Sequence, residues 1–421
     1  MTQGKHIFAD AAQFQGYTCA QMRARYNFPA HLDGTGQTVG IAEWSSGYAQ
    51  SDLDAFCSLQ GLPRCVPQYI VVDGGQNTPD AECTLDIEIA HGMAPGAKIR
   101  LYEAPSGPNY QTFWEQVLAL LTYVLHDPAR PSVLSISYGD GERDWTQQQV
   151  EAADALIGQL VAAGTTVLIS SGDQGALGLH NIYADPNHTP NADAPAVSSH
   201  AVAIGGTTVP QGGPEGAWNR PGWGATGGGI SVYLPKPGYQ DAVNHFGGRG
   251  IPDFSMLADP QTGWQIVFQA QVQPIGGTSA SAPAAAALIA CVNEARAQMN
   301  LGPVGDILPS IYEHTEVFRP VTTGDNSFMG VQGYAATAPW SPCCGLGVPD
   351  ATKFVALFLP EEVAPVTQPT QIPVFVDGKE QSFQALLQDG YAYCPIVDTA
   401  KALGFTATRD LKGVYITTPK A

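Results

Sequence analysis

The segment Gly276-Gly277-Thr278-Ser279-Ala280-Ser281-Ala282-Pro283 runs from two glycines into an alanine-rich stretch, residues 284–290. We expect an extended segment that turns at the glycines and enters a helix with serine in its first turn. Glycine lets the backbone approach a substrate closely, and the free N–H groups and positive end of a helix favour an alkoxide and a nearby oxyanion. Ser279 is therefore a candidate nucleophile. An ordinary helix capped by Ser or Thr would give the same pattern.

The sequence before this segment alternates apolar runs with helix-like segments. Such alternation, with apolar strands, predicts an α/β fold: a parallel sheet covered by helices on both faces, with ligands bound beyond the carboxyl ends of the strands. We expect strands at residues 37–42, 97–102, 132–137 and 165–170, and an amphipathic helix at 147–163.

A serine nucleophile needs a base, and residues 82–91, ECTLDIEIAH, contain candidates. Thr78-Pro79-Asp80 is a good helix start, so Glu82 and Asp86 would lie one turn apart on one face. Two carboxyls held together separate their pKa values, which leaves one ionised as a base while the other keeps its proton. A solvated acidic helix face is the alternative.

A third candidate, Asp173, follows the expected strand at 165–170, within SSGDQG at residues 170–175. The end of a strand is where this fold class places its sites. A turn aspartate would look the same.

These three segments, with further short matches in the same order, resemble the sedolisins, the serine-carboxyl peptidases with a subtilisin-like fold, and most of all their kumamolisin branch. The similarity covers most of residues 16–360. The further matches are Gly16-Tyr17-Thr18, Ala94-Pro95-Gly96-Ala97, Ser135-Ile136-Ser137-Tyr138-Gly139, Ala203-Ile204-Gly205-Gly206-Thr207, residues 224–231 and Gly250-Ile251-Pro252-Asp253.

The resemblance implies an endopeptidase that acts in acid through an acyl-enzyme. Ser279 would be the nucleophile, Glu82 its general base, and Asp86 the partner that orients Glu82 and shares a proton with it. Asp173 would be the oxyanion aspartate, protonated so that it donates a hydrogen bond. Glu43 and Tyr138 would support the site, and Ser137 and Gly139 would offer backbone groups to the substrate.

The family's calcium site looks dismantled in this sequence. Pro320 and Ser341 stand where the pattern has aspartates. Calcium needs several oxygens, carboxylates among them, so we expect no metal and no cofactor.

A boundary follows Leu359, which suggests a peptidase domain at 1–360, a proline-rich linker at 361–373 and a small α+β module at 374–421. In the module we expect a strand from Val374, a helix near Pro395–Leu403 and a strand at Gly413–Thr417. It weakly resembles the small module near the start of copper amine oxidases, and no copper chemistry follows from that.

Asp and Glu number 38 against 19 Lys and Arg, a formal charge of −19. This balance argues against binding to nucleic acid or anionic membranes. The longest apolar stretches are too short for a transmembrane helix. The start, MTQGKHIFADAAQFQ, is no signal peptide, so we expect a secreted mature form, or an unusual member without a propeptide. We expect a monomer that acts on proteins or peptides. Cys57 and Cys65 could close a small loop or remain thiols.

Two other interpretations stay open. One is a subtilisin-type peptidase using His91, although the second histidine of that motif is absent. The other is a catalytically inactive, peptide-binding relative, which the four intact residues Glu82, Asp86, Asp173 and Ser279 oppose.

Overall fold

The computed structural model describes residues 15–178, 189–210 and 212–360, and then the backbone of strands between residues 370 and 417. The chain divides into two compact units, Met1–Leu359 and Pro360–Ala421.

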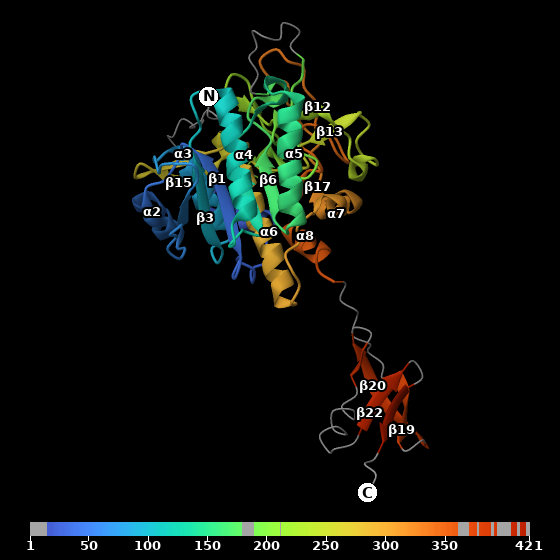
Figure 1. Cartoon of the computed structure of the whole chain (residues 1–421). Helices are drawn as coiled ribbons and strands as arrows, with labels where there is room; N and C mark the ends of the chain where they lie inside the picture. Colours follow the sequence, from blue (N-terminus) through green and yellow to red (C-terminus); the bar gives the residue numbers. More distant parts are fainter. Residues whose placement is uncertain are drawn as a thin grey trace. The chain divides into compact units, whose positions relative to one another are not determined.

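An eight-stranded sheet runs through the first unit (Figure 1). Its order is β14-β8-β6-β4-β1-β3-β2, and β9 pairs with β8 at one side. All these pairings are parallel except β8–β9. The expected strands are confirmed as β1, β3, β4 and β6. The bounds are β1 Thr38–Trp44, β2 Gln68–Val71, β3 Lys98–Ala104, β4 Val133–Ile136, β6 Thr166–Ser170, β8 Val202–Thr208, β9 Gly216–Ala217 and β14 Phe254–Leu257.

Helices cover both faces of the sheet, as predicted (Figure 1). Successive strand residues point to opposite faces: Ile41 belongs to the core beneath α3 and α6, and Ala42 to the core beneath α4 and α5. The expected amphipathic helix is α5. The helices are α1 Cys19–Arg25, α2 Gln50–Gln60, α3 Ala81–Met93, α4 Tyr110–His126, α5 Gln147–Ala162, α6 Thr278–Gln298, α7 Leu308–Glu313 and α8 Ala351–Leu357.

Short strands and hairpins surround this sheet. They are β5 Asp140–Gly141, β7 Asp193–Ala194, β10 Asn219–Arg220, β11 Gly224–Ala225, β12 Gly229–Pro235, β13 Gly248–Ile251, β15 Trp264–Phe268, β16 Gln271–Ile275, β17 Phe318–Arg319 and β18 Val348–Pro349. The hairpin β15–β16 leads directly into the glycines before α6.

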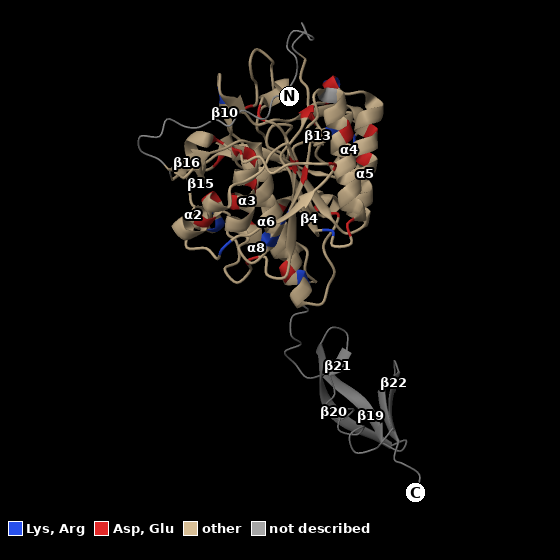
Figure 2. Ribbon diagram, turned by 60° about the vertical axis from the view of Figure 1, so that its left-hand side comes forward, with Lys and Arg blue, Asp and Glu red and all other residues tan. Residues whose placement is uncertain are grey.

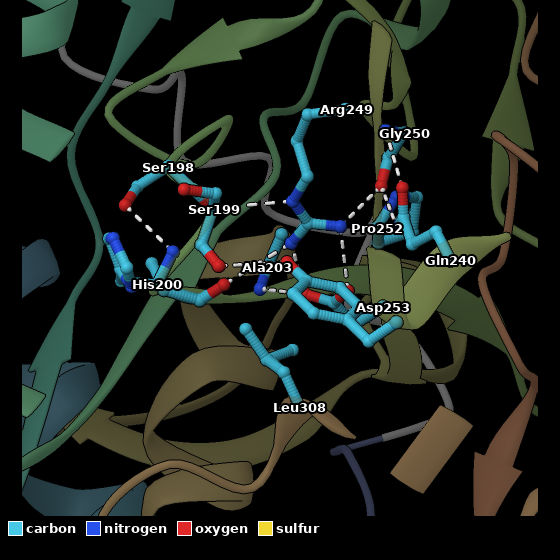
Figure 3. A network of polar contacts seen from close by, with 12 residues as sticks. Ser198, Ser199, His200, Ala203, Gln240, Arg249, Gly250, Pro252, Asp253 and Leu308 are labelled. Atoms are coloured by element: carbon cyan, nitrogen blue, oxygen red, sulfur yellow. Dashed lines mark hydrogen bonds and ion pairs between the residues drawn. The ribbon is translucent and has the colours of Figure 1, made fainter. Parts of the chain in front are cut away.

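A fully buried ion pair ties β13 to β8 and to the start of β14 (Figure 3). Arg249 Nη2 lies 2.6 Å from Asp253 Oδ2, and both side chains are 0% exposed. Asp253 also accepts hydrogen bonds from the Ala203 N–H and the Tyr312 hydroxyl, each at 2.7 Å. A buried charge is tolerated only when it is paired in this way, so the network fixes the spacing of these strands.

Figure 2 colours the ribbon by residue type and shows Asp and Glu positions spread over the first unit, with Lys and Arg in fewer places. No helix in the described part of the chain is long and apolar enough to cross a membrane. The described cysteines are free thiols, Cys57 and Cys65 among them, so no disulfide closes the loop between those two.

The second unit contains a five-stranded sheet of order β21-β20-β19-β23-β22, in which only β19–β23 is parallel. Because β19 begins at Thr370, residues 370–373 are strand and not linker, which corrects the predicted boundary. The last expected strand is β23, and the helix expected at Pro395–Leu403 lies outside the described residues. The bounds are β19 Thr370–Val376, β20 Lys379–Gln388, β21 Tyr391–Tyr393, β22 Thr406–Asp410 and β23 Gly413–Thr417.

Candidate active site

Ser279 is the second residue of α6. Gly277, just before the helix, has φ 104°, a left-handed backbone that favours glycine, and it offers no capping side chain. The Asp173 carboxylate, 105 residues away in sequence, caps the helix instead: its Oδ1 accepts from the Thr278 N–H at 2.7 Å and from the Thr278 hydroxyl at 2.8 Å. The alternative of an ordinary Ser- or Thr-capped helix is therefore wrong. The first amides of a helix lack an acceptor within it, so the Ser279 N–H is available to an oxyanion.

Glu82 and Asp86 lie one turn apart on α3, which Asp80 caps. Their side chains are almost fully buried, at 3% and 0% exposure, so a solvated acidic face is excluded. Ser137, just after β4, donates its hydroxyl to Asp86 Oδ2 at 2.8 Å, with Oδ1 at 3.0 Å. The same hydroxyl lies 3.3 Å from the carbonyl oxygen of Ser279. The carboxyl pair and the serine therefore belong to one buried cluster.

Both carboxyls of this pair have raised pKa values. Burial raises the pKa of Glu82 well above its usual value and Asp86 raises it further, whereas a hydrogen bond with Ser279 opposes the rise. Burial likewise raises the pKa of Asp86, against the hydrogen bond from Ser137. Two buried carboxyls carry one negative charge more easily than two. Glu82 can therefore be ionised, and accept the Ser279 proton, while Asp86 keeps its own.

Asp173 lies beside the same serine, in the loop after β6. Burial of its carboxyl raises its pKa, and the two hydrogen bonds from Thr278 oppose the rise. A Cβ on Gly277 would come 2.6 Å from Asp173 Oδ2, so the backbone just before α6 passes directly against that oxygen. Since Oδ1 already accepts from Thr278, Oδ2 is the oxygen suited to carry a proton. Sequence reasoning did not find Thr278, because no spacing connects it to Asp173.

The predicted supporting residues flank this cluster. Glu43, near the end of β1, is fully buried, and its pKa is raised well above its usual value by burial and then by Asp86 and Glu82. The Tyr138 ring meets the Trp44 indole edge-on, with centroids 5.2 Å apart. Glu43 therefore interacts electrostatically with both carboxyls of the pair, Asp86 and Glu82.

Gly139 follows Ser137 and Tyr138 beyond β4. A Cβ at Gly139 would come 3.0 Å from the carbonyl oxygen of Ala194, a tight approach. That Ser137 and Gly139 bind the substrate backbone stays a prediction.

His91 lies at the other end of α3 from Glu82. Its Nε2 is 2.8 Å from the Pro63 carbonyl oxygen, and it lines a cavity with Thr38 and Lys98 at the amino ends of β1 and β3. Ser279 and its partners lie at the carboxyl ends. His91 therefore cannot act as the base for Ser279.

Pro320 and Ser341, which stand where the family pattern has aspartates, bring no carboxylate to that place. Pro320 follows Arg319, and both line a cavity with Arg25 and Glu215. The Ser341 hydroxyl accepts a hydrogen bond from the Cys344 N–H at 3.2 Å. Among the described residues, no group of three or more His, Cys, Asp or Glu could hold a metal. That no calcium binds beside Pro320 and Ser341 stays a prediction, because neither residue brings a carboxylate to offset the dehydration of the ion.

Fold and site together define a class: a subtilisin-like domain in which, among the described residues, buried carboxyls surround a serine, and the histidine of α3 lies at the far end of its helix. A model of the subtilase family matches residues 70–310. Kumamolisin of Bacillus sp. (strain MN-32) is 36% identical over 373 residues, which cover 82% of this chain and 64% of that protein. Tripeptidyl-peptidase 1 of Dictyostelium discoideum is 29% identical, covering 76% of this chain and 54% of that protein.

A solved structure agrees with these relatives. Pseudomonas sedolisin, a serine-carboxyl proteinase complexed with two molecules of pseudo-iodotyrostatin, is 29% identical with a TM-score of 0.72. The match covers 81% of this chain and 97% of that one. The chain belongs to the subtilase family and, within it, to the sedolisins. It spans somewhat less than two thirds of the length of the curated relatives named above.

Proposed function

We propose that this chain is a serine-carboxyl endopeptidase that hydrolyses peptide bonds in acid through an acyl-enzyme on Ser279. The observation that carries the proposal is the hydrogen bond between Ser279 and the buried Glu82, within a cluster that also holds Asp86 and Asp173. A buried serine next to an ionisable carboxyl, at the positive end of a helix, has what acyl transfer requires: a nucleophile, a base and oxyanion donors.

In the first half of the reaction, Glu82 takes the Ser279 proton as the serine oxygen attacks the peptide carbonyl carbon. The oxyanion that forms accepts hydrogen bonds from protonated Asp173 and from the Ser279 N–H. When the intermediate collapses, the carbon–nitrogen bond breaks, Glu82 returns the proton to the leaving amine, and the acyl-enzyme remains. Water then attacks the ester with Glu82 again as base, which releases the acid and restores Ser279.

The preference for acidic pH follows from the carboxyl groups themselves. Asp173 donates a hydrogen bond only while protonated, and Asp86 must hold a proton for Glu82 to stay the ionised member of the pair. Since burial raises the pKa values of all three groups, they share a range in which one charge and two protons coexist. Activity should fall as pH rises toward neutrality.

The remaining expectations concern partners and surroundings. The charge of −19 supports peptide substrates over nucleic acid. We further infer that the protein is a secreted monomer that works without metal. The C-terminal unit, we propose, is not needed for the chemistry.

Ser279→Ala tests the proposal, with hydrolysis of a denatured protein and of a fluorogenic peptide measured between pH 3 and 7. Loss of the nucleophile should reduce kcat by roughly three orders of magnitude or more. Ser281→Ala is the matched control, because Ser281 lies in the same helix and its hydroxyl donates to the carbonyls of Met256 and Leu257, at 3.2 and 3.1 Å, and not to Glu82. Activity of Ser279→Ala within tenfold of the parent would refute the assignment. Fragment masses would separate internal cleavage from stepwise removal of tripeptides, the activity in a relative's name.

A further inference from the structure

Glu103 is a buried carboxyl that the reaction above does not use. It lies near the end of β3, in register with Glu43 on β1, and is 0% exposed. The Tyr69 hydroxyl donates to Glu103 Oε2 at 3.2 Å. Burial raises the pKa of Glu103 to about 7, and Tyr69 together with the nearby N–H groups of Ser45, Ser46 and Gln76 opposes the rise. The carboxyl thus meets two loops at once, residues 45–48 after β1 and residues 72–77 before α3.

The loop after β1 turns sharply beside Glu103. Ser45 has φ 54°, a left-handed backbone that is unfavourable for serine and persists only where surrounding contacts hold it. Its N–H donates to the Ala104 carbonyl at 2.8 Å, and its hydroxyl oxygen accepts the Ser106 N–H at 2.8 Å. Ala104 and Ser106, which follow Glu103 in the chain, therefore hold this turn in place.

The loop before α3 packs still more closely on Glu103. A Cβ on Gly75 would come 2.0 Å from Glu103 Oε2 and 2.2 Å from its carbonyl oxygen. The Val72 N–H donates to that carbonyl at 2.8 Å. The two loops are also joined to each other, because the Asn77 amide accepts the Tyr48 N–H at 2.8 Å and donates to the Tyr48 carbonyl at 3.1 Å.

The loop after β1 also binds Asp80, the residue that caps α3 and that follows the second loop in the chain. The Ser46 hydroxyl donates to Asp80 Oδ1 at 2.5 Å, and the Asp80 N–H donates to the Gly47 carbonyl at 3.0 Å. Asp80 in turn accepts the Cys83 N–H at 3.1 Å. A shift of these loops would therefore move the first turn of α3, and Glu82 with it.

We propose that Glu103 is a positioning residue for Glu82: by holding the two loops that fix Asp80, it sets the place of the general base relative to Ser279. Misplacement of a catalytic group by about 1 Å can cost about a hundredfold in rate. Because the proposal rests on the proposed function, Ser279→Ala accompanies every measurement.

Glu103→Leu and Glu103→Gln test this role, with kcat and KM measured on a fluorogenic peptide in acid and melting temperature measured alongside. We expect Glu103→Leu to lose roughly tenfold or more in kcat, and Glu103→Gln about threefold, with KM within about twofold of the parent. The control is Glu294→Gln. Glu294 is also buried, and its Oε2 accepts the N–H groups of Asp33 and Gly34 at 2.8 and 2.7 Å, on the later part of α6. It should lower the melting temperature without changing kcat.

A folded Glu103→Leu variant with the parent's kcat, or one that changes only KM, would overturn the proposal. If that variant does not fold, Glu103→Gln decides by the same criterion. Ser279→Ala as active as the parent would overturn the proposed function and this role together. An inactive Ser279→Ala beside fully active Glu103 variants would overturn this role alone.

Discussion

Replacing Asp173 separates two roles that the structure gives to one carboxyl, the cap of α6 and the donor to the oxyanion. Asp173→Ala removes both. It deletes the hydrogen bonds from the Thr278 N–H and hydroxyl, each worth about 1 kcal/mol net, so the free energy of unfolding should fall by about 2 kcal/mol. Loss of one oxyanion donor should lower kcat by about 10²–10³.

Asp173→Asn keeps the cap, because the amide oxygen can still accept from Thr278, and its NH₂ donates at every pH. In the parent, burial raises the pKa of Asp173, so the carboxyl is protonated in acid and loses its proton as pH rises. As pH rises, the protein therefore loses both activity and the stability that this protonation contributes. In Asp173→Asn that loss is gone, and the alkaline limb of kcat/KM should move to higher pH.

The measurement is kcat/KM from pH 3 to 7 on a fluorogenic peptide, with calorimetric melting at each pH. Asp154→Ala is the matched control: Asp154 accepts the Ser198 hydroxyl at 2.7 Å and the Ser199 N–H at 2.8 Å, on α5 away from Ser279. It should lose similar stability and leave the pH profile unchanged. A parent-like kcat in Asp173→Ala would show that Asp173 only caps the helix. An alkaline limb that does not move in Asp173→Asn would refute the titration of Asp173 as the cause of the activity loss at higher pH.

Four further outcomes are expected. Burial raises the pKa of Asp140 to about 7, so the folded chain keeps a proton that the unfolded chain releases near pH 4. The free energy of unfolding should therefore fall by up to about 4 kcal/mol as pH rises from 4 to 7. Asp140→Asn should flatten that fall in guanidinium unfolding, and an unchanged slope would contradict it. Arg249→Met leaves Asp253 buried without its cation and should lower the free energy of unfolding by about 3–5 kcal/mol. The double variant Arg249→Met/Asp253→Asn should recover part of that loss, and no recovery would count against the ion pair. EDTA should leave melting temperature and activity unchanged, whereas a drop that added calcium reverses would show a metal site. Truncation after Val363 should preserve hydrolysis of small peptides, and complete loss in a folded truncated chain would show that the C-terminal unit completes the site.

Local sequence predicts this molecule well wherever a contact is local. The strands that became β1, β3, β4 and β6 follow from apolar runs, and the pairing of Glu82 with Asp86 follows from the helical repeat. The cap that Asp173 provides could not be predicted, because it joins residues 105 positions apart. The bond from Ser137 to Asp86 spans 51 positions and depends on how α3 packs on the sheet.

The misplaced linker boundary has a physical reason of the same kind. Proline-rich sequence predicts a linker, yet Pro373 lies within β19, opposite Ser382 of β20. On its other side β19 pairs with β23 only from Val374 onward. Pro373 therefore lies just before the pairing of β19 with β23 begins, near the start of its strand, where a residue without an N–H is tolerated.

The acid preference proposed for this chain follows from the whole site and from no single group. Glu43, Glu82, Asp86 and Asp173 all have raised pKa values, because burial disfavours their charged forms. For Glu43, Glu82 and Asp86, neighbouring carboxylates add to that effect. Making Asp173 neutral removes only one titration, and the Glu82–Asp86 pair still has to share a proton. His91, the one imidazole on α3, lies at the wrong end of the helix and has a pKa lowered by burial. A shift to neutral pH would therefore require a different base in a different place.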